Sequence, residues 1–244
     1  MEEIAAYREE QQKKLEKLEN FESCRAALQE QLQKTEQKLD AAAHNLSKIR
    51  RNYAKRLETQ IIEGLRDLNF LHVAFEISFE KTKSYTENGT DAVEFLISTN
   101  PGEAIRPLAK VVSGGELSRI MLAIKTILAD RDETETLIFD EIDTGISGRT
   151  AQKVSEKMAQ IGQRHQVICI THLPQIAAMA DSHFEIEKNV EENETVTLIH
   201  PLSEEDSVRE LARMLGGAKI TDSVLANASE MKELAQVQKS ARLK

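Results

Sequence analysis

The chain has 244 residues, of which 40% are hydrophobic and 30% are charged, and its formal net charge is −9. This length fits one large domain or one domain with an extension, and the acidic balance excludes a chain that is basic overall, although a local basic patch can still contact nucleic acid. The two cysteines are isolated, which predicts a reducing, cytoplasmic location without disulfides. No apolar segment is long enough to span a membrane, and the N-terminus is acidic, so neither a membrane span nor a signal peptide is predicted.

Residues 1–62 are predicted to form a coiled-coil arm. Residues 1–60 contain no Gly or Pro and are rich in Glu, Gln, Lys, Ala and Leu. Apolar residues recur at heptad spacing, imperfectly at the start and well from Leu28 to Tyr53. A solvated single helix packed on a domain is the alternative, but a helix this long cannot bury its apolar seam on a small domain. The seam therefore needs a partner helix.

Residues 63–244 are predicted to form a separate head, beginning near Gly64, which is expected to end or loosen the long helix. Apolar residues alternate with polar ones over 73–79 and again over 93–97, and Asn88-Gly89 between them is a strong turn signal. These two stretches predict a β-hairpin.

The middle of the chain alternates between helical and strand-like segments. Residues 115–129 predict a helix, 136–142 an apolar strand, 148–161 an amphipathic helix, and 166–171 a second buried strand. This order implies a parallel sheet with right-handed crossovers, in which ligands bind at the carboxyl ends of the strands. A further hairpin (184–199) and C-terminal helices follow. The predicted fold class is therefore α/β, with crossover helices and β-hairpins preceded by the long helix.

Ser113, Gly114, Gly115 and Glu116 stand at the start of the first of these helices. One interpretation is a capping box, in which Ser113 and Glu116 satisfy free backbone donors. The other adds the two glycines, which remove side chains where backbone N–H groups at a positive helix end can approach a phosphate.

Three further candidates lie at the predicted carboxyl ends of the two buried strands. Asp140 and Glu141 follow the first strand, where Asp140 can hold Mg²⁺ and Glu141 can polarise an attacking water; the alternative is a pair of solvated acids. His172 follows the second strand and can donate to a γ-phosphate oxygen, although a lone His is more often structural or merely exposed. The turn beginning at Asp143 is either a capped loop or a loop at a subunit interface.

These motifs together resemble the ATP-binding-cassette superfamily, and in particular its SMC-like branch with coiled-coil arms. The resemblance is carried by VVSGGELSRIMLAIK from Val111, TLIFDEIDTGISGRTAQKV from Thr136 and VICITHLPQIAAMAD from Val167. Within that branch, the DTGISG loop, the approach from Asn100 and the ELARMLGG segment from Glu210 are similar to the RecN family of bacterial repair proteins.

The resemblance implies a role for each candidate residue. Ser113, Gly114, Gly115 and Glu116 correspond to the signature motif that reaches ATP held by an opposite head. Asp140 corresponds to the magnesium-binding Walker B aspartate and Glu141 to the catalytic base. The remaining two are Asp143, as the acid of the D-loop, and His172, as the switch histidine. The implied fold is the C-terminal lobe of an ABC-type ATPase head.

The sequence departs from the family pattern because it contains no G-x-x-x-x-G-K-[ST] phosphate loop. It therefore resembles the C-terminal half of an ATPase, which needs ATP, Mg²⁺, an N-terminal Walker A half and a second head as a homodimer. The resemblance implies DNA double-strand break repair and recombination, with DNA as a partner at the nucleoid and no membrane. By itself, this chain is expected to hydrolyse no ATP. A non-catalytic structural fragment and a transporter-type nucleotide-binding subunit are the alternatives.

A basic cluster near the base of the predicted arm is the one charge feature compatible with DNA contact. The cluster consists of Lys48, Arg50, Arg51, Lys55 and Arg56. An ordinary solvated helix face is the alternative interpretation, and salt-dependent DNA binding would distinguish the two.

Overall fold

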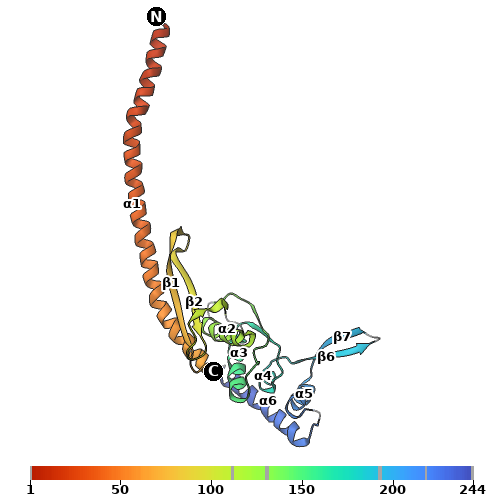
Figure 1. The fold of residues 1–244 in the computed structure, drawn as a ribbon. Coiled ribbons are helices and arrows are strands. Elements are labelled where there is room, and N and C mark those ends of the chain that lie inside the picture. Colours follow the sequence, from red (N-terminus) through yellow and green to blue (C-terminus); the bar gives the residue numbers. More distant parts are fainter. Residues whose placement is uncertain (1, 111–112, 130–131, 192–193, 218, 243–244) are drawn as a thin grey trace. The chain divides into compact units, whose positions relative to one another are not determined.

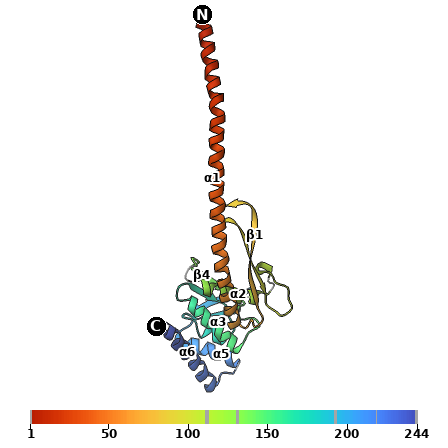
Figure 2. The same cartoon turned by 90° about the vertical axis from the view of Figure 1, so that its left-hand side faces the viewer.

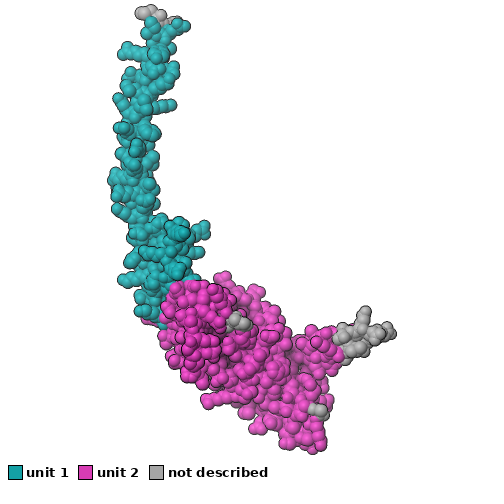
Figure 3. All heavy atoms as spheres, in the orientation of Figure 1, with its two compact units in different colours: residues 1–55, 79–93 teal, residues 56–78, 94–244 magenta. Residues whose placement is uncertain are grey.

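The computed structural model describes residues 2–110, 113–129, 132–191, 194–217 and 219–242. Val111 and Val112, which begin the predicted signature stretch, lie outside the described residues. The chain divides into two compact units, unit 1 with residues 1–55 and 79–93, and unit 2 with residues 56–78 and 94–244 (Figure 3). The boundary between an arm and a head at residues 62 and 63 stays a prediction.

The long helix α1 (Glu2–Asp67) is uninterrupted, as the absence of Gly and Pro from residues 1–60 predicts (Figure 1). Gly64 was predicted to end or loosen this helix, but the helix continues through Gly64 to Asp67. Asn69, with a left-handed φ of 72°, follows the last turn instead, and the Phe70 amide donates back to the Leu65 carbonyl at 3.1 Å. In unit 1, apolar seam side chains of α1 such as Ile4 and Leu18 are exposed, at 72% and 67%.

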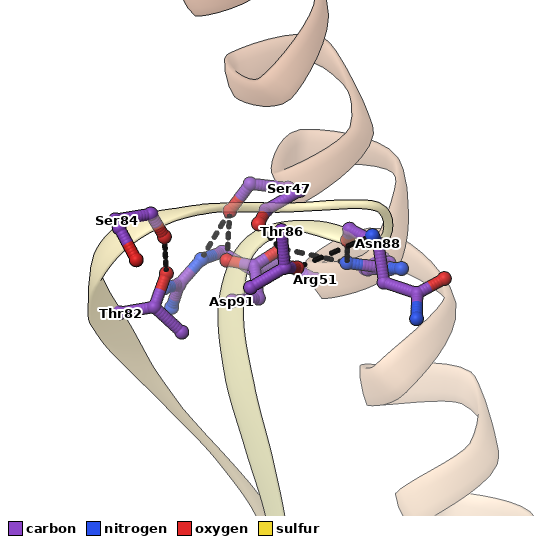
Figure 4. A network of polar contacts seen from close by, with 9 residues as sticks. Ser47, Arg51, Thr82, Ser84, Thr86, Asn88 and Asp91 are labelled. Carbon is purple, nitrogen blue, oxygen red and sulfur yellow. Dashed lines mark hydrogen bonds and ion pairs between the residues drawn. The ribbon is translucent and has the colours of Figure 1, made fainter.

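The predicted hairpin is formed by β1 (Ala74–Thr86) and β2 (Gly89–Ser98). Both strands extend further toward the turn than alternation of apolar residues predicted, because polar contacts hold that end within unit 1. Figure 4 shows this network: Ser47 Oγ donates to Asp91 at 2.7 Å, and Arg50 donates to the same carboxylate at 3.3 Å and to the Asn88 carbonyl at 2.7 Å.

Two members of the basic cluster take part in this packing of unit 1. Arg50 pairs with Asp91, whose side chain is only 3% exposed. The Arg51 guanidinium lies 4.7 Å from the centre of the Phe79 ring, a cation–π distance. Arg50 and Arg51 therefore hold the hairpin, which favours a structural role for them over DNA contact.

Unit 2 contains the predicted parallel pair of strands. β4 (Thr136–Phe139) and β5 (Gln166–Cys169) are parallel and in register, with Thr136 opposite Gln166 and Phe139 opposite Cys169. The crossover between them is α3 (Gly148–Ile161), which lies beside α2 (Gly114–Leu128) (Figures 1 and 2). The α/β class with a parallel sheet, crossover helix and hairpins is therefore confirmed. A short strand β3 (Arg106–Pro107) pairs with β2, and a 3₁₀ turn, η1 (Leu108–Lys110), follows.

The two faces of the β4–β5 pair differ in burial. Leu137 and Phe139 are buried on one face, where they belong to the core with residues of α2 and α3. On the other face the isoleucines are open: Ile138 is 67% exposed, Ile168 45% and Ile170 50%. Parallel sheets normally have both faces covered, so this second face is an unusual surface for a folded protein.

The C-terminal part of unit 2 consists of a hairpin and three helices. β6 (Phe184–Glu191) and β7 (Glu194–Pro201) are antiparallel. α4 (Pro174–Ala177), α5 (Glu204–Gly216) and α6 (Asp222–Arg242) enclose a small core. This core is made of Ala177, Ala178, Leu211, Ala212 and Ala228. None of the described helices is long and apolar enough to cross a membrane.

Candidate active site

The start of α2 has the Ser113 cap that the capping interpretation predicted. Ser113 is the N-cap residue, with extended backbone angles, and its Oγ accepts from the Glu116 amide at 3.5 Å. The Leu117 amide donates to the Ser113 carbonyl at 2.9 Å, which closes the first turn. The first-turn backbone donors are thereby aligned at the positive end of a fifteen-residue helix.

The two glycines of the signature stretch pack directly against Glu141. A Cβ placed on Gly114 would lie 2.6 Å from Glu141 Oε2, and one on Gly115 would lie 2.8 Å from the Glu141 carbonyl oxygen. Cβ atoms do not approach other atoms so closely, so neither position accommodates a side chain without movement. The lack of side chains at Gly114 and Gly115 therefore allows the start of α2 to pack against Glu141, in addition to the predicted approach to phosphate. As a result, the helix start and the acidic end of the strand lie side by side.

Two polar side chains of α2 fasten the loop that follows β4. Ser118 Oγ donates to the Asp140 carbonyl at 2.9 Å. Arg119 Nη1 donates to the Ile142 carbonyl at 3.2 Å and to the Thr144 carbonyl at 2.8 Å. Both residues bond to backbone carbonyls of the loop, so these contacts leave the Asp140 and Glu141 carboxylates unused.

Arg119 is a site residue that the sequence argument did not single out. It is 7% exposed, and its guanidinium lies 5.5 Å from the centre of the Phe70 ring. Burial lowers the pKa of Arg119, and the nearby Glu116 carboxylate opposes that shift. Two signals in the sequence could have identified it: Arg119 lies three residues after the signature glutamate, and it is a lone charge on the apolar side of a helix.

Asp140 and Glu141 are exposed at the carboxyl end of β4. Strand β4 ends at Phe139, three residues earlier than predicted, because the backbone turns here: Glu141 has a left-handed φ of 56°, and its amide donates to Asp140 Oδ1 at 2.9 Å. A non-glycine residue in this region is strained, and such strain is concentrated at functional sites. The two exposed carboxylates supply the oxygen donors that Mg²⁺ prefers, so the residues fit the predicted ion.

Asp143 and His172 lie in direct contact, which the sequence did not predict. The Asp143 carboxylate is 3% exposed, and its Oδ2 accepts from Thr171 Oγ1 at 2.6 Å and from the His172 amide at 2.8 Å. The same oxygen lies 3.0 Å from His172 Nδ1. The His172 side chain is 73% exposed. With Nδ1 occupied by Asp143, Nε2 is the ring nitrogen of His172 that remains for a ligand.

These contacts sort the predicted site residues into two groups. One group consists of Gly114, Gly115 and Glu141. Asp140 belongs to it because its carbonyl accepts from Ser118 Oγ. Asp143 and His172 form the other, and the loop held by Arg119 connects the two. Asp143 therefore contacts residues of its own chain, among them His172.

Cys169, at the end of β5, is expected to be nearly inert toward thiol reagents. Burial, together with the negative charges of Asp143 and Asp140, raises the pKa of this thiol to about 12. Because the thiolate is the reactive form and only about one molecule in 1,000 carries it at pH 9, the reaction should be slow, and its rate should rise about tenfold for each pH unit below 12. Mass spectrometry after iodoacetamide treatment at several pH values measures this rate. The exposed Cys24 is the internal reference, and equal labelling of both cysteines at pH 8 would contradict the prediction.

No protein-family model matches the sequence, but relatives with known names do. The chain is 39% identical to the DNA repair protein RecN of Bacillus subtilis, with 95% of this chain and 43% of the relative aligned. It is 44% identical to RecN of Halalkalibacterium halodurans over 85% of this chain and 38% of the relative, and 44% identical to RecN of Vibrio cholerae over 78% and 35%. The chain thus spans less than half the length of these relatives.

Among solved structures, the chain is similar to the Smc head domain with a coiled coil and joint from Pyrococcus yayanosii. That match has a TM-score of 0.48 and 20% identity, and it covers 67% of this chain and 29% of that one. The evidence for the family is therefore the sequence identity, which extends through the signature helix, the acidic strand and the histidine loop. On this evidence the chain belongs to the RecN family of DNA repair proteins and corresponds to its C-terminal half.

Proposed function

We propose that this chain is the C-terminal part of the ATPase head of a protein that acts in DNA double-strand break repair and recombination. The observation that carries the proposal is the packing of the signature glycines on Glu141, with Asp140 exposed beside it. Backbone donors at a helix start, an acidic pair and a histidine then lie on one connected piece of structure. That combination suits hydrolysis of the γ-phosphate of ATP.

Within this proposal, each side chain has a distinct role. Glu141 orients the attacking water and accepts its proton, and Asp140 holds Mg²⁺, which when bound neutralises phosphate charge. His172 donates from Nε2 to a γ-phosphate oxygen, and Asp143 fixes the ring. Ser113 and the N–H groups of the first turn of α2 contact ATP held by a second head, so two heads sandwich two nucleotides.

The β- and γ-phosphates require a phosphate loop, which the N-terminal half of the protein supplies in this proposal. The open face of the β4–β5 pair supports such a partner, because Ile138, Ile168 and Ile170 leave apolar surface in water on a two-stranded parallel sheet. Burying these side chains against further strands or helices would stabilise the assembly by about 25 cal/mol for each Å² removed from water.

The arm and the DNA partner are further parts of the proposal. The exposed seam of α1 suits a second helix in a coiled coil, because isolated apolar residues such as Leu18 and Phe21 recur along one side of a helix of 66 residues. Dimerisation and release of the heads would then move the arms. The proposed place of action is the bacterial nucleoid in the cytoplasm, because the substrate is DNA.

The proposal is tested by measuring ATP hydrolysis by this chain alone and with the N-terminal half of the same protein. The chain alone should release no phosphate above background, because it has no phosphate loop. The two halves together should hydrolyse ATP in a Mg²⁺-dependent manner, and removing Mg²⁺ with a chelator should abolish turnover. Continued inactivity of a correctly folded, associated pair would favour the alternative, a non-catalytic structural module.

A further inference from the structure

Unit 2 contains a polar cavity of about 490 Å³ that shares no residue with the active site described above. It lies between the start of α5, the base of the β6–β7 hairpin, the segment 178–184 and one face of α6. The α6 side chains that line it are Lys232, Gln236, Lys239 and Ser240. Their spacing of four, seven and eight residues places them on the same face of the helix. The volume is within the range of small-ligand sites.

A buried hydroxyl connects two titratable groups at this cavity. Ser207 is 2% exposed, and its Oγ accepts from Lys232 Nζ at 2.7 Å and lies 2.9 Å from His183 Nδ1. Burial lowers the pKa of His183, Glu210 opposes this shift, and the charge of Lys232 adds to the lowering. The contact with Ser207 uses one of the three N–H donors of Lys232, so two remain.

The two lysines of the cavity have weak partners. The Lys232 side chain is 15% exposed, and its ion pair is with Glu204, which is 3.9 Å away and 81% exposed. The Lys239 side chain is 23% exposed and bonds to Asp181 at 2.6 Å, although Asp181 is 88% exposed. Exposed carboxylates contribute little to such pairs and are easily displaced. Both lysine side chains are therefore mostly buried, whereas the carboxylates that pair with them are exposed to water.

We propose that this cavity binds a phosphate ester, with Lys232 and Lys239 as its charged ligands. A phosphate provides the compact negative charge and several acceptor oxygens that suit two lysines lining one cavity, and lysine binds phosphate as a point charge. The Gln236 amide lines the same wall and supplies a further donor. The cavity has room for more than a bare phosphate ion, which favours an ester. The proposal is independent of the ATPase function, because none of these residues belongs to the active site.

The test is a calorimetric titration of the 244-residue chain with pyrophosphate, which is expected to bind with a stoichiometry of one. Lys232→Met and Lys239→Gln should each weaken binding about tenfold, the effect of one charge-assisted hydrogen bond. Lys219→Gln makes the same charge change at an exposed residue before α6 and should leave the affinity unchanged. Lys239→Gln removes only a contact to an exposed carboxylate, so this variant should fold. Its pyrophosphate affinity therefore tests the proposal even if Lys232→Met does not fold.

Two sources of the phosphate are distinguished by adding a short single-stranded oligonucleotide to the same titration. If the oligonucleotide competes with pyrophosphate for the wild-type chain but not for Lys239→Gln, the ligand is the phosphate of a nucleic-acid strand. Undiminished pyrophosphate binding in its presence would identify a small phosphate ester. Absence of binding to the wild-type chain, or equal weakening by Lys219→Gln and Lys239→Gln, would overturn the proposal.

Discussion

Glu141→Gln is expected to reduce ATP turnover of the complete two-half protein by about 10²–10⁴-fold, the range for loss of a general base. The amide has nearly the same shape as the carboxylate but cannot accept a proton from the attacking water. ATP binding should persist, because the contacts to the phosphates do not depend on Glu141. Two heads should therefore stay joined around uncleaved ATP. Phosphate release measures the turnover, and sedimentation with ATP measures the trapped dimer.

The matched control for this substitution is Glu133→Gln, an identical chemical change on an exposed residue before β4. It should leave both turnover and oligomeric state unchanged. The thermal unfolding temperature of Glu141→Gln should also match the wild type, because the left-handed backbone at Glu141 accommodates Gln as it does Glu. Normal ATP turnover by Glu141→Gln would show that the general base is another residue.

Gly115→Ala is expected to lower the free energy of unfolding by about 1–3 kcal/mol, the usual cost of adding a methyl group to a filled site. The new Cβ would lie 2.8 Å from the Glu141 carbonyl oxygen and 3.0 Å from Thr144 Cβ. The first of these neighbours is backbone, and Arg119 holds the loop that carries both of them. The chain cannot rotate a side chain aside, so α2 and the loop must separate. Denaturant unfolding measures the change.

Gly114→Ala should behave differently, although it is the adjacent glycine. Its Cβ would meet Glu141 Oε2 at 2.6 Å, the far end of a flexible and exposed side chain that can rotate away. Stability should therefore stay within about 0.5 kcal/mol of the wild type, as for most surface changes. In the complete protein, however, turnover should fall because the displaced carboxylate no longer meets the attacking water.

Gly64→Ala is the control for both substitutions. Gly64 lies inside α1, and its Cβ would make ordinary contacts at 3.7 Å with Ala123 and Ile127. Replacing glycine in a helix interior removes unfolded-state freedom, so the stability should rise by about 0.5–1 kcal/mol. Equal destabilisation by all three glycine substitutions would show that packing on Glu141 is not the reason for Gly114 and Gly115.

The order of elements was predictable because it depends on local patterns. The apolar run before Asp140 predicted a buried strand, and its alternation with amphipathic helices predicted the parallel pairing of β4 and β5. Ser113 was predictable as a cap because capping involves residues three positions apart. Even where the prediction failed, at Gly64, the reason is tertiary: packing of α1 within unit 2 outweighs the low helix propensity of one glycine.

The sequence alone determined the long helix, the α/β class, the family resemblance and the identity of the acidic pair. Only the tertiary structure decided how those residues act on one another. Four contacts join residues that are 23 to 29 positions apart in the chain. Arg119 donates to the carbonyls of residues 142 and 144, the His172 amide donates to Asp143, and Gly114 packs against Glu141. Periodicity and capping report on neighbours within a few residues, whereas these contacts arise only when two strand ends and a helix start are brought to one edge of the sheet.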